Sequence, residues 1–322
     1  MHVREKYLRS AVGVILCAFF MYLFVSKPAL PIYLETGKLP AIKVPETTAP
    51  TIEASPPPET TQPPPPALPV FSPEDASLVS VNSNFSYQAD LDAFLQAPLQ
   101  WDLHTDAPSV LILHTHATES YLKTESYTET SAYRTLNEQY NMVSIGDRIA
   151  QSLENQGISV LHDRTLHDYP SYNDAYYLAR DTIAAYLKKY PSIRLVLDLH
   201  RDSITDANGK QLGETVSTEL GNAARVMLVV GTDAGGSYHP DWEENMALAV
   251  KLHARLEQRY PGICRPISLR TQRYNQDLFP ATLLIEVGAA GNTREEALLS
   301  AQLLSQCISD LSRGSATANS TR

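Results

Sequence analysis

Two histidines and two glutamates stand where apolar segments of this chain give way to polar ones. His116 precedes Glu119 by three residues, His200 follows an apolar run, and Glu286 lies near the end of another. Zinc hydrolases use imidazole nitrogens and often one carboxylate as metal ligands, with a further acid or base nearby. Each residue alone suits a structural role equally well. Their joint arrival at the ends of apolar segments favours one metal-dependent site.

The elements that must position these residues alternate along the chain. Short apolar runs predict strands at 110–113, 158–161, 193–199, 225–231 and 282–287, and helical spacing predicts helices at 143–156, 172–190, 242–260 and 294–311. Such alternation is typical of an α/β fold with a mostly parallel sheet flanked by helices. Ligands bind at the carboxyl ends of such strands, where His116, His200 and Glu286 fall.

At these residues the sequence resembles a known family. The motifs are His-Thr-His-Ala-Thr-Glu-Ser-Tyr at 114–121, Asp-Leu-His-Arg-Asp-Ser at 198–203, Tyr-Asn-Gln-Asp-Leu at 274–278 and Glu-Val-Gly-Ala-Ala-Gly-Asn-Thr-Arg-Glu-Glu-Ala at 286–297. Segments 162–163 and 167–173 fit as well. Over roughly residues 109–311 the chain is similar to the stage II sporulation protein P family.

The resemblance implies an activity. We expect an amidase-like three-layer sandwich that cleaves the amide bond between N-acetylmuramic acid and L-alanine of peptidoglycan, in septum thinning and engulfment during sporulation. Whether endopeptidase activity is added stays open. The implied partners are the stage II sporulation proteins D and M.

The resemblance also implies roles for individual residues. His116 and His200 become ligands of one Zn²⁺, and Glu286 becomes the base that takes a proton from water and delivers it to the leaving amine. The carboxylate ligand stays open among Glu119, Glu129 and Glu138. We favour Glu119, because it lies inside the first motif.

Neighbouring polar residues allow two interpretations. Arg201 either binds a stem-peptide carboxylate or polarises the scissile carbonyl, or it forms a structural ion pair with Asp198 or Asp202. We assign it a catalytic role. Asn245 and Arg270 are further candidates of the same kind.

Three other histidines stay outside the predicted ligand set. His114 is either a residue near the metal or substrate or a buried group satisfied by the backbone. His162 and His167 either line the site or cap a loop.

The amino terminus predicts membrane insertion. Residues 11–25 form an unbroken apolar stretch, with Arg4, Lys6 and Arg9 before it and Lys27 after it. Its length suits a short bilayer span, and no cleavage site of the A-x-A kind follows. We expect a retained anchor with a cytoplasmic amino terminus and an extracytoplasmic domain.

The remaining chain divides by composition. Residues 28–75 hold most of the 22 prolines and predict an unpacked linker, because such a segment cannot form a core. We expect an anchor and cytoplasmic tail at 1–27, an unassigned lead-in at 76–108, the catalytic domain at 109–313 and a disordered tail at 314–322.

Net charge limits the possible binding partners, and cysteine content limits the possible disulfides. The net charge is −10, which argues against nucleic acid. Besides Cys17, only Cys264 and Cys307 are present, and whether they pair stays open.

Two other functions remain. A non-catalytic peptidoglycan-binding scaffold would use the same fold with structural histidines. A metal-dependent phosphoesterase would suit residues 198–202, but it usually needs several aspartates around two metals.

Overall fold

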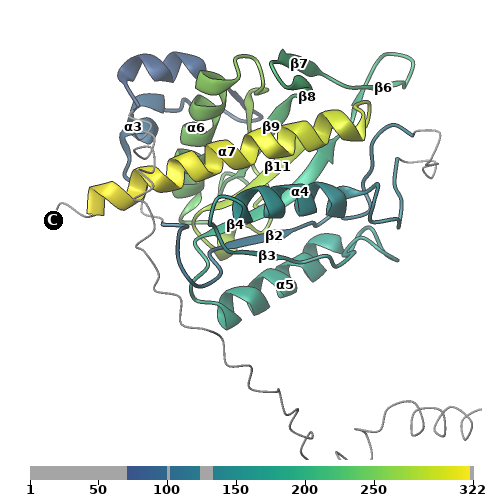
Figure 1. Cartoon of the computed structure of the whole chain (residues 1–322), viewed down its shortest axis with the longest axis horizontal. Coiled ribbons are helices and arrows are strands. Elements are labelled where there is room, and N and C mark those ends of the chain that lie inside the picture. The colour runs from purple at the N-terminus through teal and green to yellow at the C-terminus, as the bar shows by residue number, and fades with distance from the viewer. Residues whose placement is uncertain (1–70, 100–101, 124–132, 320–322) are drawn as a thin grey trace, which may run out of the picture. The chain divides into compact units, whose positions relative to one another are not determined.

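A seven-stranded sheet in the order β1-β10-β9-β11-β4-β2-β3 forms the centre of the molecule (Figure 1). The computed structural model describes residues 71–99, 102–123 and 133–319. The expected anchor and nearly all of the expected linker lie outside these ranges. The strands are β1 (Val81–Ser83), β2 (Val110–Leu113), β3 (Val160–His162), β4 (Leu195–Asp202), β9 (Val226–Gly231), β10 (Ile267–Arg270) and β11 (Thr282–Ala289).

The sheet is mostly parallel, as the sequence predicts. The pairs β1–β10, β10–β9, β11–β4, β4–β2 and β2–β3 are parallel, whereas β11 and β9 pair antiparallel. Two hairpins lie between β4 and β9: β5 (Ile204–Thr205) with β6 (Gln211–Leu212), and β7 (Thr215–Thr218) with β8 (Gly221–Ala224).

The long helices begin close to their predicted positions. They are α4 (Met142–Glu154), α5 (Ala175–Lys189), α6 (Trp242–Arg259) and α7 (Arg294–Asn319). The side chain of Asn141 accepts a hydrogen bond from Val143 N, 3.0 Å away, which satisfies a free amide in the first turn of α4. The shorter elements are η1 (Pro73–Leu78), α3 (Leu91–Gln96) and η2 (Gln276–Leu278).

Strand alternation gives the sheet two different faces. One face buries Leu197, Ile285 and Leu228 in the main core with α4, α6 and α7, while Leu111 and Val196 on the other face pack against α5. Figure 1 shows α5 on the opposite side of the sheet from α4 and α7. Helices therefore occupy both faces, in three layers, but α5 contacts the second face only near β2 and β4.

The sheet and the last helix both extend beyond residues 109–313, the range expected for the catalytic domain. β1 pairs with β10, so part of the lead-in belongs to the sheet, and the domain starts before residue 109. α7 continues to Asn319, so most of the tail expected to be disordered is helical. β10, which the sequence did not predict, lies between β1 and β9.

Two further observations concern membrane-spanning helices and the cysteines. None of the helices in the described ranges combines the length and apolarity of a membrane span. Cys264 and Cys307 are both buried and unpaired, so they form no disulfide.

Candidate active site

Glu286 and His200 are direct register partners on the adjacent parallel strands β11 and β4. Side chains of paired residues leave the same face of a sheet, so the carboxylate and the imidazole share the face that carries α5. His200 is 4% exposed, and Glu286 has a fully buried oxygen, Oε2. The sequence placed both residues at strand ends, whereas both lie inside their strands.

Glu119 reaches this pair from the turn after β2. Its backbone N–H donates to the carbonyl of His116 over 3.2 Å, which closes the turn between them. Its Oε2 accepts a hydrogen bond of 3.2 Å from the backbone N–H of Arg201 and lies 3.7 Å from Nδ1 of His200. Glu119 is 5% exposed, so its carboxylate is held inside the site.

His116 completes the group through aromatic contacts. Its ring centroid lies 5.4 Å from that of His200, nearly perpendicular to it. Tyr172 stacks on the other imidazole face at 4.4 Å, and Tyr176 meets its edge at 5.5 Å. Tyr172 is exposed, so it separates His116 from solvent.

Asp198 anchors the opposite side of His200. Its two carboxylate oxygens accept hydrogen bonds from the backbone N–H and the hydroxyl of Thr115, at 2.8 and 2.6 Å. Nε2 of His200 lies 3.0 Å from Oδ1 of Asp198, within ion-pair distance but without the alignment of a hydrogen bond. The segment after β2 is thereby tied to β4.

Burial and neighbouring charges change the acidity of the site. Burial raises the pKa of Glu286 to about 8 and lowers the pKa of His116 to about 4, with the charge of His200 contributing to the latter. Burial also opposes protonation of His200, but the paired Asp198 together with the charges of Glu119 and Glu286 outweighs it and raises the pKa of His200 to about 9. Displaced acidities of this kind are typical of active sites.

The donor types fit zinc, although the arrangement is not a closed ligand set. Two buried atoms of the site have no polar partner among the described residues: Nδ1 of His116 and Oε2 of Glu286. Such atoms call for a ligand or an ion. However, no three His, Cys, Asp or Glu side chains within residues 71–99, 102–123 and 133–319 lie close enough to hold a metal ion as placed.

The structure distinguishes between the candidates for the carboxylate ligand of the metal. Glu138 forms an exposed ion pair with Arg164, 2.6 Å away, rather than a contact with His116 or His200. Glu129 lies outside the described residues. Of the two described candidates, only Glu119 contacts a predicted histidine ligand.

Arg201 anchors the segment that carries Glu119. It points away from Asp198 and Asp202, because alternate residues of β4 face opposite sides. Its guanidinium donates to the carbonyls of Ser120 and Tyr133, both at 3.0 Å, and lies 3.7 Å from Glu119. Arg201 therefore holds the Glu119 segment, and a catalytic role for it stays a prediction.

The remaining predicted histidines belong to the framework. Nδ1 of His114 donates to the carbonyl of Leu199, and His167 bridges the carbonyl of His114 and the hydroxyl of Thr182. Nε2 of His162 lies 2.9 Å from Nε2 of His114.

Sequence reasoning missed the residues that surround His116. Arg134 pairs with Asp168 at 2.6 Å, and its guanidinium lies 4.5 Å from the Tyr172 ring centre. Asp168 also accepts from the hydroxyl of Thr118. Only the presence of Asp168 and Tyr172 in the 167–173 motif could have indicated them.

The fold and this cluster define an α/β protein with a histidine–carboxylate site on one partly covered face of its sheet. A family model described as Stage II sporulation protein P matches residues 52–309, and the chain belongs to that family. The stage II sporulation protein P of Bacillus subtilis (strain 168) is 30% identical over 222 residues, which cover 64% of this chain and 51% of that protein. The chain thus spans about half the length of this curated relative.

Solved amidase structures show a distant likeness. An N-acetylmuramoyl-L-alanine amidase from Clostridium difficile 630 aligns over 68% of this chain and all of its own, with 15% identity and a TM-score of 0.37. The CwlD amidase from Clostridioides difficile, in complex with the GerS lipoprotein, covers 65% and 99% of the two chains, with 11% identity and a TM-score of 0.41. Similarities this low carry no weight for the site.

Proposed function

We propose that the chain is a zinc-dependent peptidoglycan hydrolase that cleaves the amide bond between N-acetylmuramic acid and L-alanine during sporulation. Membership of the stage II sporulation protein P family supports the peptidoglycan substrate. The observation that carries the proposal is the pairing of Glu286 with His200 on one sheet face, where Oε2 of Glu286 is buried without a hydrogen-bond partner among the described residues.

The residues of the site have separate roles in the proposed hydrolysis: metal binding, proton transfer and positioning. His116, His200 and Glu119 would hold Zn²⁺, which supplies polarisation of the amide carbonyl and acidification of water when bound. Glu286 accepts a proton from the attacking water as the carbon–oxygen bond forms. It then delivers this proton to the nitrogen of L-alanine as the carbon–nitrogen bond breaks. Arg201 is a positioning residue that acts through Glu119.

The proposed location and partners rest on the sequence. We propose a membrane anchor at residues 11–25, an extracytoplasmic catalytic domain and complexes with the stage II sporulation proteins D and M. Protein purified from membranes should begin at or near Met1. Amino termini beyond Ser26 in most molecules would remove the anchor from the proposal.

Glu286→Gln tests the reaction itself. The amide is close in size to the carboxylate but accepts no proton, and a positioned acid or base contributes about 10² to 10⁴ in rate. The variant should therefore bind zinc and sacculi and lose the release of stem peptides by about that factor. Undiminished release by a folded, zinc-loaded variant would assign the base elsewhere, and absence of release by the wild type would favour the non-catalytic scaffold.

A further inference from the structure

The face of the sheet that carries Glu286 continues as a pocket beyond the proposed reaction centre. The pocket has a volume of about 280 Å³ and extends from Glu286 across β9 and β10 to Asn82 on β1. Its floor consists of same-face residues of neighbouring strands, because Glu286 pairs with Met227 and Ser268 pairs with Val229. The pocket therefore runs across the strands from Glu286 to β1, and Tyr176 of α5 also lines it.

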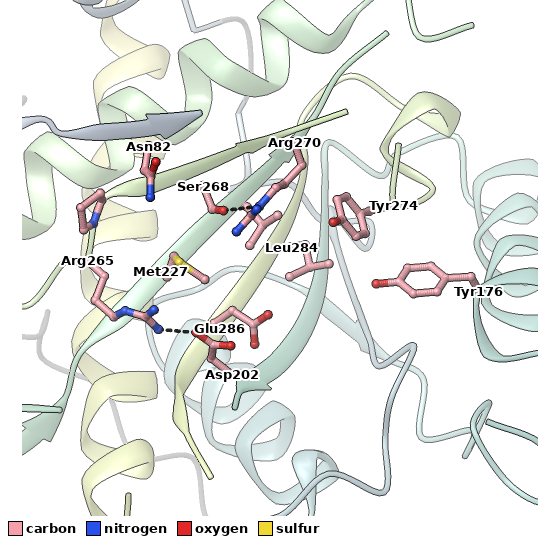
Figure 2. A pocket seen from close by; sticks show the side chains of 12 residues that line it. Asn82, Tyr176, Asp202, Met227, Arg265, Ser268, Arg270, Tyr274, Leu284 and Glu286 are labelled. Atoms are coloured by element: carbon pink, nitrogen blue, oxygen red, sulfur yellow. Dashed lines mark hydrogen bonds and ion pairs between the residues drawn. The ribbon is translucent and has the colours of Figure 1, made fainter. Parts of the chain in front are cut away.

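Two arginines line this pocket, and their partners differ. Arg265 lies 2.6 Å from Asp202 and 3.7 Å from Glu214, so its charge is neutralised within the protein. Arg270 donates from Nε to the hydroxyl of Ser268 over 2.7 Å, and none of the described carboxylates forms an ion pair with it. Figure 2 shows Arg265 joined to Asp202 beside Glu286, and Arg270 joined to Ser268 farther along the pocket.

The wall beside Arg270 has an unusual backbone. Tyr274 and Asn275 both adopt left-handed conformations, with φ of 52° and 59°, which a tyrosine rarely adopts. The side chain of Asn275 donates to the carbonyl of Tyr176 over 2.8 Å, and the rings of Tyr274 and Tyr176 lie 5.9 Å apart. These contacts hold both tyrosines at the pocket that contains Glu286 and Arg270. Strained backbone that is held in this way clusters at binding sites.

The distance between Arg270 and Glu286 determines how long a ligand must be to contact both residues. Their strands flank β9, but Glu286 pairs with Met227 and Arg270 with Gly231, four residues farther along β9. With strands about 4.8 Å apart and a rise of about 3.3 Å per residue, their Cα atoms are roughly 16 Å apart. The hydrogen bond to Ser268, which is level with Val229, brings the Arg270 guanidinium back to roughly 12 Å from Glu286. An extended peptide covers about 3.4 Å per residue, so a negative group beside Arg270 would be carried about three to five residues from an amide bond held at Glu286.

We propose that Arg270 binds a free carboxylate of the stem peptide and thereby selects the peptide that is presented to Glu286. A guanidinium without a carboxylate partner matches a carboxylate through two parallel hydrogen bonds. The inference rests on the proposed function for its substrate, and it adds a specificity-determining residue outside the metal site.

The test compares two synthetic N-acetylmuramoyl tripeptides, one with free peptide carboxylates and one with these carboxylates amidated. Hydrolysis and equilibrium binding are measured on the full-length wild type, Arg270→Gln and Arg270→Lys. Arg270→Gln should lose about 10-fold or more in kcat/KM on the free acid, mainly through KM, and less than about twofold on the amide. Arg270→Lys should fall between, because lysine keeps the charge but not the paired donors.

Arg259→Gln serves as the matched control. Arg259 lies on α6, outside the pocket, and forms an ion pair with Asp310 over 2.8 Å. This variant should behave as wild type with both compounds.

The outcomes separate the inference from the proposed function. Equal losses on both compounds, or no loss, would overturn the role of Arg270 while hydrolysis stands. If the wild type cleaves neither compound, the hydrolase proposal fails, and the binding data still decide the inference. Failure of the wild type to bind either compound would overturn both.

Discussion

Arg201 contacts Glu119 through both its backbone and its side chain. The backbone N–H donates to Oε2 over 3.2 Å, and the guanidinium lies 3.7 Å from Oε1. Because Arg201 lies beside His200 in β4, the strand that carries a proposed metal ligand also fixes the position of another. The separation between Glu119 and His200 is thus set by the strand itself.

Arg201→Ala should destabilise the fold as well as the site. The substitution removes two hydrogen bonds to backbone carbonyls and a positive charge beside the buried Glu119 carboxylate, which keeps Arg134 and the backbone N–H of residue 201 as partners, so we expect a loss of about 3 kcal/mol in free energy of unfolding. Urea unfolding measures this loss. Arg225→Ala is the control, since its ion pair with Glu214 is largely exposed and contributes less than about 1 kcal/mol. An Arg201→Ala chain with wild-type stability and no activity would support the catalytic assignment.

His116→Ala and His200→Ala should each lose most of the bound zinc. We expect about one zinc per wild-type chain, since removal of one of three protein ligands leaves too few donors for tight binding. Elemental analysis of the purified chains gives the stoichiometry, with His104→Gln as a control at a histidine outside the site. Full zinc occupancy in the His200→Ala chain would exclude that residue as a ligand.

Gly146→Ala should destabilise the protein, although alanine normally favours helices. A Cβ at this position in α4 would meet Nε2 of His162 and lie 2.7 Å from Nε2 of His114. We expect a loss of about 1 to 3 kcal/mol from overpacking, against a gain of about 1 kcal/mol from helix propensity. Gln151→Ala, at an exposed position of the same helix, should change stability by less than about 0.5 kcal/mol. A stabilised Gly146→Ala chain would show that both imidazoles can move away from the added methyl group without a loss of stability.

Acidification should unfold the protein partly through His253. Burial lowers the pKa of this histidine to about 4 in the folded chain, from about 6.5 when unfolded. Below pH 6.5 the unfolded chain binds a proton that the folded chain does not, so stability is complete above that pH and falls as the pH approaches 4. From pH 7 to pH 5, the wild type should lose about 2 kcal/mol more than His253→Gln. Equal losses in urea titrations at the two pH values would remove His253 as a contributor.

The sequence predicted the long elements well because their ends are marked locally. Asn141 caps α4, Pro191 follows α5, and the core strands carry unbroken apolar runs. β10 was missed because Ser268 and Arg270 face the pocket and interrupt its apolar pattern. β1 has only three residues, which is too short for a periodic signal.

The site was predictable in residue type but not in contacts. The pairing of His200 with Glu286 follows from adjacent strands, which spacing along the chain does not reveal. The contacts of Arg201 were not predicted, because the strand was expected to end at Leu199, before this residue. Once β4 extends through Asp202, alternation places Arg201 opposite Asp198 and Asp202.

The antiparallel pairing of β9 with β11 has a consequence for how this site can diversify. Because β9 starts at the edge where β4 ends, the chain between Asp202 and Val226 leaves and re-enters the sheet on one side, through two small hairpins. No strand order depends on that excursion. Evolution or engineering can lengthen or exchange its first hairpin, β5–β6, which is largely exposed, whereas the second packs on α7 through the buried Ala223 and Ala224. Asp202 at the root of the first hairpin already borders the pocket beside Glu286. Residues 203–211 are therefore the natural place to graft new substrate preferences onto an unchanged reaction centre.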